Sequence, residues 1–93
     1  MRNYELTLIY TSDEELYKSA SQKVKAILKD SGATIDKEED KGVRELAYDI
    51  KKESKGRYIF SLIKAEPASI VEIERKLKIE AGLLKFLFIK ANE

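Results

Sequence analysis

The side chains best suited to chemistry in this sequence are basic, and many of them gather in its middle. Between Lys41 and Lys64 there are seven lysines and arginines but only three acidic residues, although the whole chain has a net charge of +1. Such a local excess favours a polyanion, because lysine and arginine donate hydrogen bonds to phosphate oxygens. Basic residues on a predicted hairpin and at strand ends are therefore candidate contacts to the phosphates of a structured RNA: Arg2, Arg44, Lys51, Lys52, Lys55, Arg57, Lys85 and Lys90.

The same sequence lacks the residues that most often carry out catalysis. The chain has no histidine and no cysteine, so the commonest general base, the commonest metal ligand and any thiol nucleophile are missing. The acidic run at 36–40 lacks the spacing of an EF-hand calcium loop and is interpreted as a solvated loop. Acylphosphatases need an arginine-bearing phosphate loop after their first strand, whereas the sequence there is the acidic TSDEE. We therefore predict no enzyme activity, no metal, no cofactor and no small-molecule substrate.

The composition predicts one domain over residues 1–93. Hydrophobic residues make up 43% of the chain, which is enough for a core at this length without a metal or a disulfide. No apolar run approaches the length of a membrane span, and the start MRNYELTLIY alternates like a strand rather than resembling a signal peptide. We expect a soluble, cytoplasmic protein with no membrane partner.

Hydrophobic periodicity divides the chain into strands and helices. Apolar residues alternate with polar ones from Tyr4 to Tyr10, which predicts a strand. Ser12 and Glu15 have the spacing of a capping box at a helix start, and Gly82 is expected to break the second helix. The predicted order is a strand at 3–10, a helix at 13–30, a long strand at 33–50 bulged or looped near 40–42, a hairpin turn at 51–56, a strand at 57–65, a helix at 67–78 and a strand at 83–90.

This order is the split βαβ pattern of the ferredoxin-like α+β fold, in which two helices cover one face of a four-stranded antiparallel sheet. The first and third strands are central in that sheet, and helices do not cover their second faces. Phe86 and Phe88 can fill the helix side of the last strand. A large uncovered apolar face on a small protein favours a partner protein. The residues predicted on this face are Ile9, Tyr58, Phe60, Leu62, Leu87 and Ile89.

A base-stacking RNA-recognition motif is not supported. The stretch KGRYIF at 55–60 begins like the octamer of that motif. However, the stacking positions would fall on Arg57, Ile59 and Leu62, whereas the aromatic residues are Tyr58 and Phe60. We therefore expect contacts to the RNA backbone instead.

The stretch GVRELAYDIK at 42–51 resembles the signature of the bacterial small-subunit ribosomal protein six family. The first-strand sequence RNYE, the hairpin glycine and tyrosine at 56 and 58, the Glu-Pro helix start and the closing LLKFLFIK are also similar, so the resemblance spans essentially the whole chain. It implies a structural, ribosome-bound protein that binds the central domain of 16S rRNA as a heterodimer with ribosomal protein eighteen and aids subunit assembly.

The resemblance also implies individual roles. Arg2 matches a phosphate contact of the family. Tyr4 matches a tyrosine that packs at the first strand, and it is included among the candidate contacts to RNA or the partner protein. The other basic positions that match are Arg44, Lys85 and Lys90, all expected to contact RNA or the partner protein. Leu46 and Tyr48 are expected to hold the second strand in place, and the sequence departs from common members at Glu45 and Asp49.

One alternative from another class remains open at this stage. A ferredoxin-like protein can form a homodimer through its open sheet and act as a ligand-binding or regulatory module. The basic hairpin and the absence of a glycine-rich ligand loop argue against this interpretation. A stable dimer with no affinity for RNA would favour it.

Overall fold

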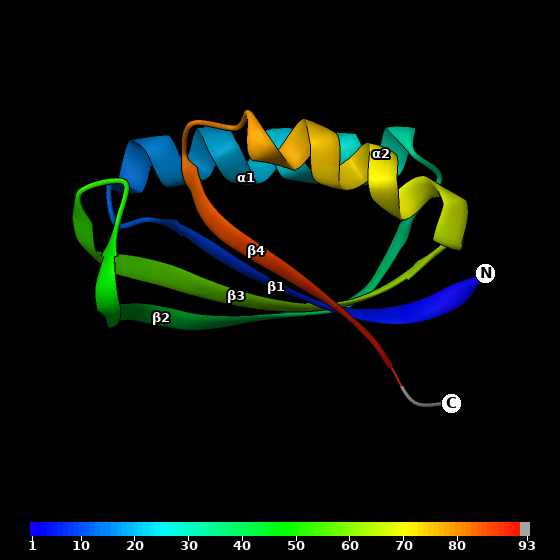
Figure 1. The fold of residues 1–93 in the computed structure, drawn as a ribbon, viewed down its shortest axis with the longest axis horizontal. Coiled ribbons are helices and arrows are strands. Elements are labelled where there is room, and N and C mark those ends of the chain that lie inside the picture. The colour runs from blue at the N-terminus through cyan, green and yellow to red at the C-terminus, as the bar shows by residue number, and fades with distance from the viewer. Residues whose placement is uncertain (92–93) are drawn as a thin grey trace.

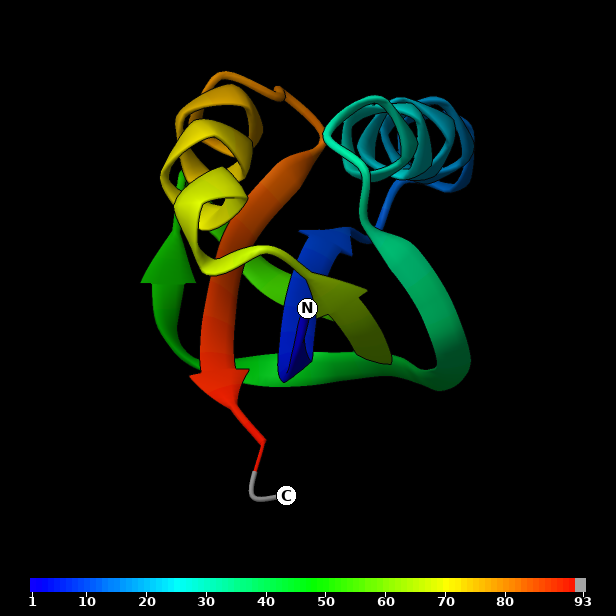
Figure 2. The same ribbon diagram turned by 90° about the vertical axis from the view of Figure 1, so that its right-hand side faces the viewer.

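The computed structural model describes residues 1–91 and confirms the predicted ferredoxin-like arrangement. The antiparallel sheet has the strand order β2-β3-β1-β4, and both helices lie on one of its faces (Figures 1 and 2). The elements are β1 (Arg2–Thr11), α1 (Glu14–Asp30), β2 (Thr34–Ile50), β3 (Glu53–Ala65), α2 (Pro67–Lys78) and β4 (Leu83–Lys90). Within residues 1–91 no helix combines the length and the apolar character needed to cross a membrane.

The core lies between the sheet and the two helices. Alternate side chains of a strand point to the same face, so Leu6 and Leu8 of β1 are buried on the helix side together with Ile63 of β3. Phe86 and Phe88 also pack against this core, as predicted. The helices contribute their inward stripes, with Ala20, Val24 and Leu28 from α1 and Ile73 and Leu77 from α2.

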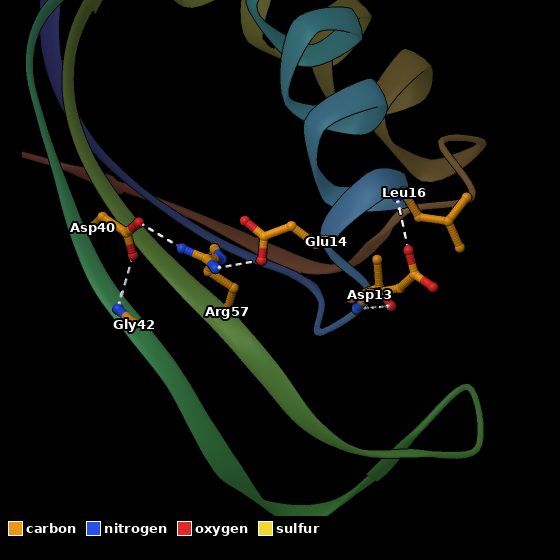
Figure 3. A network of polar contacts seen from close by, with 7 residues as sticks. Asp13, Glu14, Leu16, Asp40, Gly42 and Arg57 are labelled. Carbon is orange, nitrogen blue, oxygen red and sulfur yellow. Dashed lines mark hydrogen bonds and ion pairs between the residues drawn. The ribbon is translucent and has the colours of Figure 1, made fainter.

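The start of α1 lies one residue later than the predicted capping box. Asp13 is the N-cap residue, and its Oδ1 atom accepts a hydrogen bond from the backbone N–H of Leu16 at 3.0 Å (Figure 3). The prediction that Ser12 caps the helix is therefore wrong. An aspartate provides the same oxygen acceptor as serine, and its charge also favours the positive end of the helix dipole.

The acidic run at 36–40 is part of strand β2 rather than a solvated loop. The predicted irregularity near 40–42 is confirmed, because the pairing with β3 shifts between Asp40 and Gly42. Gly42 has a φ of 82°, and its N–H donates to Oδ1 of Asp40 at 2.8 Å. A glycine suits this bulge because other residues rarely adopt such a positive φ. The pairing shifts again between Ile35 and Lys37 and between Glu45 and Ile50.

The hairpin turn is tighter than predicted. It consists of Lys51 and Lys52, which both have positive φ, and it joins Ile50 to its pairing partner Glu53. Two consecutive positive φ values suit the right-handed twist of a hairpin. Gly56 therefore lies inside β3 and not in the turn.

Gly82 does not end α2, which stops at Lys78. Instead, Gly82 is buried where the chain passes α1, and a Cβ atom at this position would lie 2.6 Å from Cβ of Ala20 and 3.0 Å from the carbonyl oxygen of Leu16. The absence of a side chain therefore allows the start of β4 to approach α1 closely.

Candidate nucleic-acid and partner interface

The sheet face opposite the helices is apolar and partly exposed. Leu87 and Ile89 of β4 are 52% and 47% exposed, and Tyr58, Phe60 and Leu62 of β3 are partly exposed. We call these five residues the open face. Ile9 was predicted to be exposed with them, but only 8% of its surface is accessible, so this prediction is wrong.

Ile9 is buried because the hairpin folds across this end of the sheet. Beyond Gly56, the end of β2 and the start of β3 pass beneath the sheet and rise beside β4 (Figure 2). A Cβ atom on Gly56 would lie 2.6 Å from Cγ2 of Ile9 and 3.4 Å from Cδ2 of Leu46. Leu46 is half-buried at this contact, in agreement with its predicted structural role. The packing of Leu46 and Gly56 against Ile9 could not be anticipated from alternation alone.

Two hydrogen bonds join the end of the hairpin to β4. Nζ of Lys51 donates to the carbonyl oxygen of Leu83 at 3.0 Å, and Nζ of Lys85 donates to the hydroxyl of Tyr48 at 3.2 Å. These bonds connect residues 32 and 37 positions apart in the sequence. They bring two of the predicted basic residues, Lys51 and Lys85, to one end of the sheet, and Lys52 follows Lys51 in the turn. We call Tyr48, Lys51, Lys52 and Lys85 the hairpin-end cluster.

The exposed position of Tyr48 differs from the sequence-based prediction. It was expected to hold β2 in place, yet 64% of its surface is exposed. Alternation suggested a packed side chain, but this part of β2 overhangs the sheet. The tyrosine shortly before the lysine pair in LAYDIKK was the available signal. However, no sequence pattern shows where an overhanging hairpin folds.

Arg2 and Lys90 lie at the opposite end of the sheet. Arg2 pairs with Ala65, and Lys90 pairs with Tyr4, whereas Lys85 pairs with Ile9. Lys85 and Lys90 are five positions apart on β4, which corresponds to roughly 17 Å. Arg2 and Lys90 are both exposed. The structure therefore divides these basic residues between the two ends of the sheet, with Lys85 on the open face and Arg2 and Lys90 at positions of the helix-side face.

Three other predicted residues have different surroundings. Tyr4 is buried in the core and packs edge-to-face with Phe88, their ring centroids 6.3 Å apart. This position agrees with its predicted packing role, whereas its predicted contact with RNA or the partner protein stays a prediction, with only 9% of the residue exposed. Arg44 is exposed on β2 and donates through Nε to the carbonyl oxygen of Lys41 at 3.3 Å, and Lys55 is exposed on β3.

Arg57 lies on the helix side of the sheet and is held by two carboxylates. Its guanidinium donates to Oδ2 of Asp40 at 2.7 Å and to Oε2 of Glu14 at 3.3 Å (Figure 3). It also lies 4.5 Å from the ring centroid of Tyr17, and only 19% of its side chain is exposed. Partial burial by itself would lower the pKa of Arg57, but Asp40 and Glu14 raise it by more. Arg57 thus links β3 to β2 and α1, and its contact with RNA stays a prediction.

Comparison with known proteins identifies the family of the chain. The family model described as ribosomal protein S6 matches residues 3–90. This chain belongs to the ribosomal protein S6 family. The S6 family consists of structural ribosomal proteins and not enzymes, as the sequence predicted.

The matches to individual S6 proteins cover nearly the full chain. The small ribosomal subunit protein bS6 of Treponema denticola is 41% identical over 93 residues, with 100% of both chains covered. That of Treponema pallidum strain Nichols is 37% identical, with 99% of both chains covered. The crystal structure of 30S ribosomal protein S6 from Thermotoga maritima has a TM-score of 0.86 and 26% identity, and the match covers 97% of this chain and 87% of that one.

Proposed function

We propose that this S6-family protein is a structural constituent of the small ribosomal subunit in the cytoplasm. In this role it binds the central domain of 16S rRNA together with ribosomal protein eighteen and aids subunit assembly. Its relatives carry the name of a small-subunit protein over the full length of the chain. The observation that carries the proposal is the exposed apolar face of the sheet, with Lys85 on that face and further exposed basic residues at both ends of the sheet.

The open face is the proposed site for ribosomal protein eighteen. Leu87 and Ile89 would be buried by a protein surface, and burial of apolar area favours association. Among the ion pairs of residues 1–91, none involves a residue of β4. A partner seated there would adjoin Lys85, which shares this face of β4 with Leu87 and Ile89, while Arg2 and Lys90 lie at the far end of the sheet. The two proteins would then offer a combined surface to a folded RNA.

The basic residues at both ends are the proposed contacts to RNA phosphates. Arg2, Lys52, Lys85 and Lys90 are exposed, and each phosphate contact releases counterions from the RNA. Affinity should therefore fall as salt rises, with a steeper slope when more of these residues take part. Recognition of a folded junction by backbone contacts and shape needs no stacking on the central strands.

A salt-dependent binding titration tests the proposal. The RNA is a fragment of the 16S central domain, the control is an unrelated folded RNA of equal length, and each is titrated with and without ribosomal protein eighteen. We expect affinity for the 16S fragment to rise sharply when the partner is present. Binding to both RNAs with equal affinity, with and without the partner, would overturn the proposal. A stable homodimer in that case would support the ligand-binding alternative.

A further inference from the structure

Tyr48 presents an aromatic ring on the surface in a fixed orientation. Its hydroxyl accepts a hydrogen bond from Nζ of Lys85 at 3.2 Å, and the same Nζ lies 5.7 Å from the ring centroid. The ammonium group is therefore much nearer to the hydroxyl than to the ring centre. The ammonium group therefore lies at the hydroxyl edge of the ring and does not cover either of its faces. With 64% of the residue exposed, the ring is available to a planar group from outside.

The hairpin holds this ring in place. Lys51 anchors the turn to β4 through the carbonyl oxygen of Leu83, and Leu46 lies against the position of Gly56 above Ile9. The ring therefore stands on an element that is anchored on both sides. A surface fixed before binding loses less conformational freedom when a ligand orders it.

The charges of this hairpin end are mainly positive. Lys85 contacts Tyr48, Lys51 bonds Leu83 of β4, and Lys52 follows Lys51 in the turn, all three exposed. The acidic residues of the same segment are Asp49 and Glu53. The carboxylate of Glu53 accepts a hydrogen bond from Oγ1 of Thr11 at 2.7 Å, so one acidic group is engaged within the chain. An aromatic ring among ammonium groups matches a nucleotide, which combines a flat base with a phosphate.

We propose that Tyr48 stacks on one unpaired base of the bound RNA, while Lys52 and Lys85 contact the phosphates beside it. This inference rests on the proposed RNA-binding function and adds a base contact to it. The platform lies at the end of the hairpin and not on the central strands, where the RNA-recognition motif carries its aromatic residues. A protein partner would find a more apolar surface at Leu87 and Ile89.

The first experiment measures RNA affinity with ribosomal protein eighteen present, at several salt concentrations. The variants are Tyr48→Leu, which removes the ring, and Tyr48→Phe, which retains it. We expect Tyr48→Leu to weaken binding roughly 5- to 150-fold without changing the salt slope, because stacking releases no counterions. Tyr48→Phe should restore most of the affinity. Lys52→Gln should instead lower the slope by about one.

The second experiment identifies the base. Each unpaired nucleotide of the 16S fragment is replaced in turn by an abasic one, and the wild type is compared with Tyr48→Leu on each RNA. We expect a single abasic position at which the two proteins bind equally. An undiminished difference at every position would overturn the inference, as would unchanged affinity of Tyr48→Leu for the intact RNA.

A third measurement separates RNA from protein contacts. If Tyr48→Leu weakens the complex with ribosomal protein eighteen when RNA is absent, Tyr48 belongs to the protein interface and the inference is wrong. Failure of the proposed function itself gives a different result, since the wild-type protein then shows no preference for the 16S fragment. The wild-type titration therefore distinguishes the two failures.

Discussion

On the helix side of the sheet, Arg57 lies between Asp40 and Glu14 and against the ring of Tyr17. On the opposite side, Lys85 bonds the hydroxyl of Tyr48 and remains exposed. Both pairs consist of a basic residue and a tyrosine, and both join distant segments. In the first pair the positive charge is neutralised within the chain. In the second the charge and the ring stay accessible, so only the second pair is suited to an external ligand.

The same contrast holds for apolar residues. Leu6 of β1 is fully buried on the helix side, whereas Leu87 of the adjacent strand β4 is 52% exposed on the open face. One leucine stabilises the isolated protein, and the other has surface left to bury against a partner. Leucines on the helix side of the sheet therefore stabilise the fold, whereas leucines on the open face are available for the proposed binding of a partner.

The largest expected effect is that of Leu6→Ala, with Leu87→Ala as its matched control. Removing the buried side chain should lower the free energy of unfolding by about 2–5 kcal/mol. The exposed change should cost about 0.5 kcal/mol or less. Urea denaturation of the isolated protein measures both values. Equal losses would mean that the open face is already covered in solution, for example by self-association.

Gly56→Ala should have the next largest effect, because it places an atom between β3 and Ile9. The new Cβ would lie 2.6 Å from Cγ2 of Ile9 and 3.2 Å from the carbonyl oxygen of Tyr10. We expect a loss of about 1–3 kcal/mol and faster amide exchange around the hairpin turn. The control is Ser54→Ala at an exposed position of the same strand. A variant as stable as the control would show that Ile9 can move aside.

Arg57→Gln and Lys85→Gln compare the two tyrosine-associated cations directly. Loss of the guanidinium leaves Asp40 and Glu14 without their shared partner and should cost about 1–2 kcal/mol, since hydrogen bonds between charged groups are stronger than neutral ones. Lys85→Gln should change stability by about 0.5 kcal/mol at most. Denaturation and RNA titration are measured on both variants.

For RNA binding we expect the reverse order. Lys85→Gln should lower the salt slope by about one, whereas Arg57→Gln should leave it unchanged. A lower slope for Arg57→Gln would show that this guanidinium reaches a phosphate in spite of its ion pairs. In that case the contrast between the two sides of the sheet would not extend to RNA.

The smallest expected effect concerns Glu39 on the exposed part of β2. Hydrogen bonds from Lys41 and Lys37 lower the pKa of Glu39 from its ordinary value of 4.5 to about 2. A lowered pKa in the folded state stabilises the fold above pH 4.5, and this contribution is lost as the pH falls toward 2. Because Glu39 and its two lysine partners are exposed to solvent, salt should weaken this contribution to stability.

Carboxyl titration by NMR checks this value. Lys41→Gln should raise the pKa of Glu39 toward 4.5, with Lys90→Gln as a control distant from this strand. A midpoint near 4.5 in the wild-type protein would show that the lysines do not hold Glu39 in solution. The charges of β2 would then behave like ordinary surface charges, unlike those around Arg57.

The strands and helices were predictable because each follows a local rule. Alternation in β1, Pro67 at the start of α2 and the run LLKFLFIK in β4 identified their elements, and the bounds of α2 and β4 agree with the prediction. The hairpin turn was predicted too long because Gly56 was included in it, whereas Lys51 and Lys52 alone adopt the positive φ values of the turn. Sequence rules favour asparagine and glycine for that geometry.

The arrangement of the candidate site was less predictable because it depends on contacts between distant residues. The sequence indicated that Lys51, Lys85 and Arg57 were similar basic candidates. Whether each charge is neutralised depends on the fold, which places Asp40 and Glu14 beside Arg57 but Tyr48 beside Lys85. The exposure of Tyr48 likewise follows from the path of the hairpin.

The anchoring of the hairpin to β4 sets an order of events during synthesis. The ribosome makes Lys51 before Leu83, its hydrogen-bond acceptor 32 residues later. A nascent chain can pair β2 with β3 as soon as both have emerged, but Tyr48 has no Lys85 to hold its hydroxyl until β4 follows. The hairpin-end cluster is therefore assembled only after its last strand is made. In the proposed RNA-binding role, unfinished chains would not present the ordered cluster to RNA and would not compete through it with completed protein.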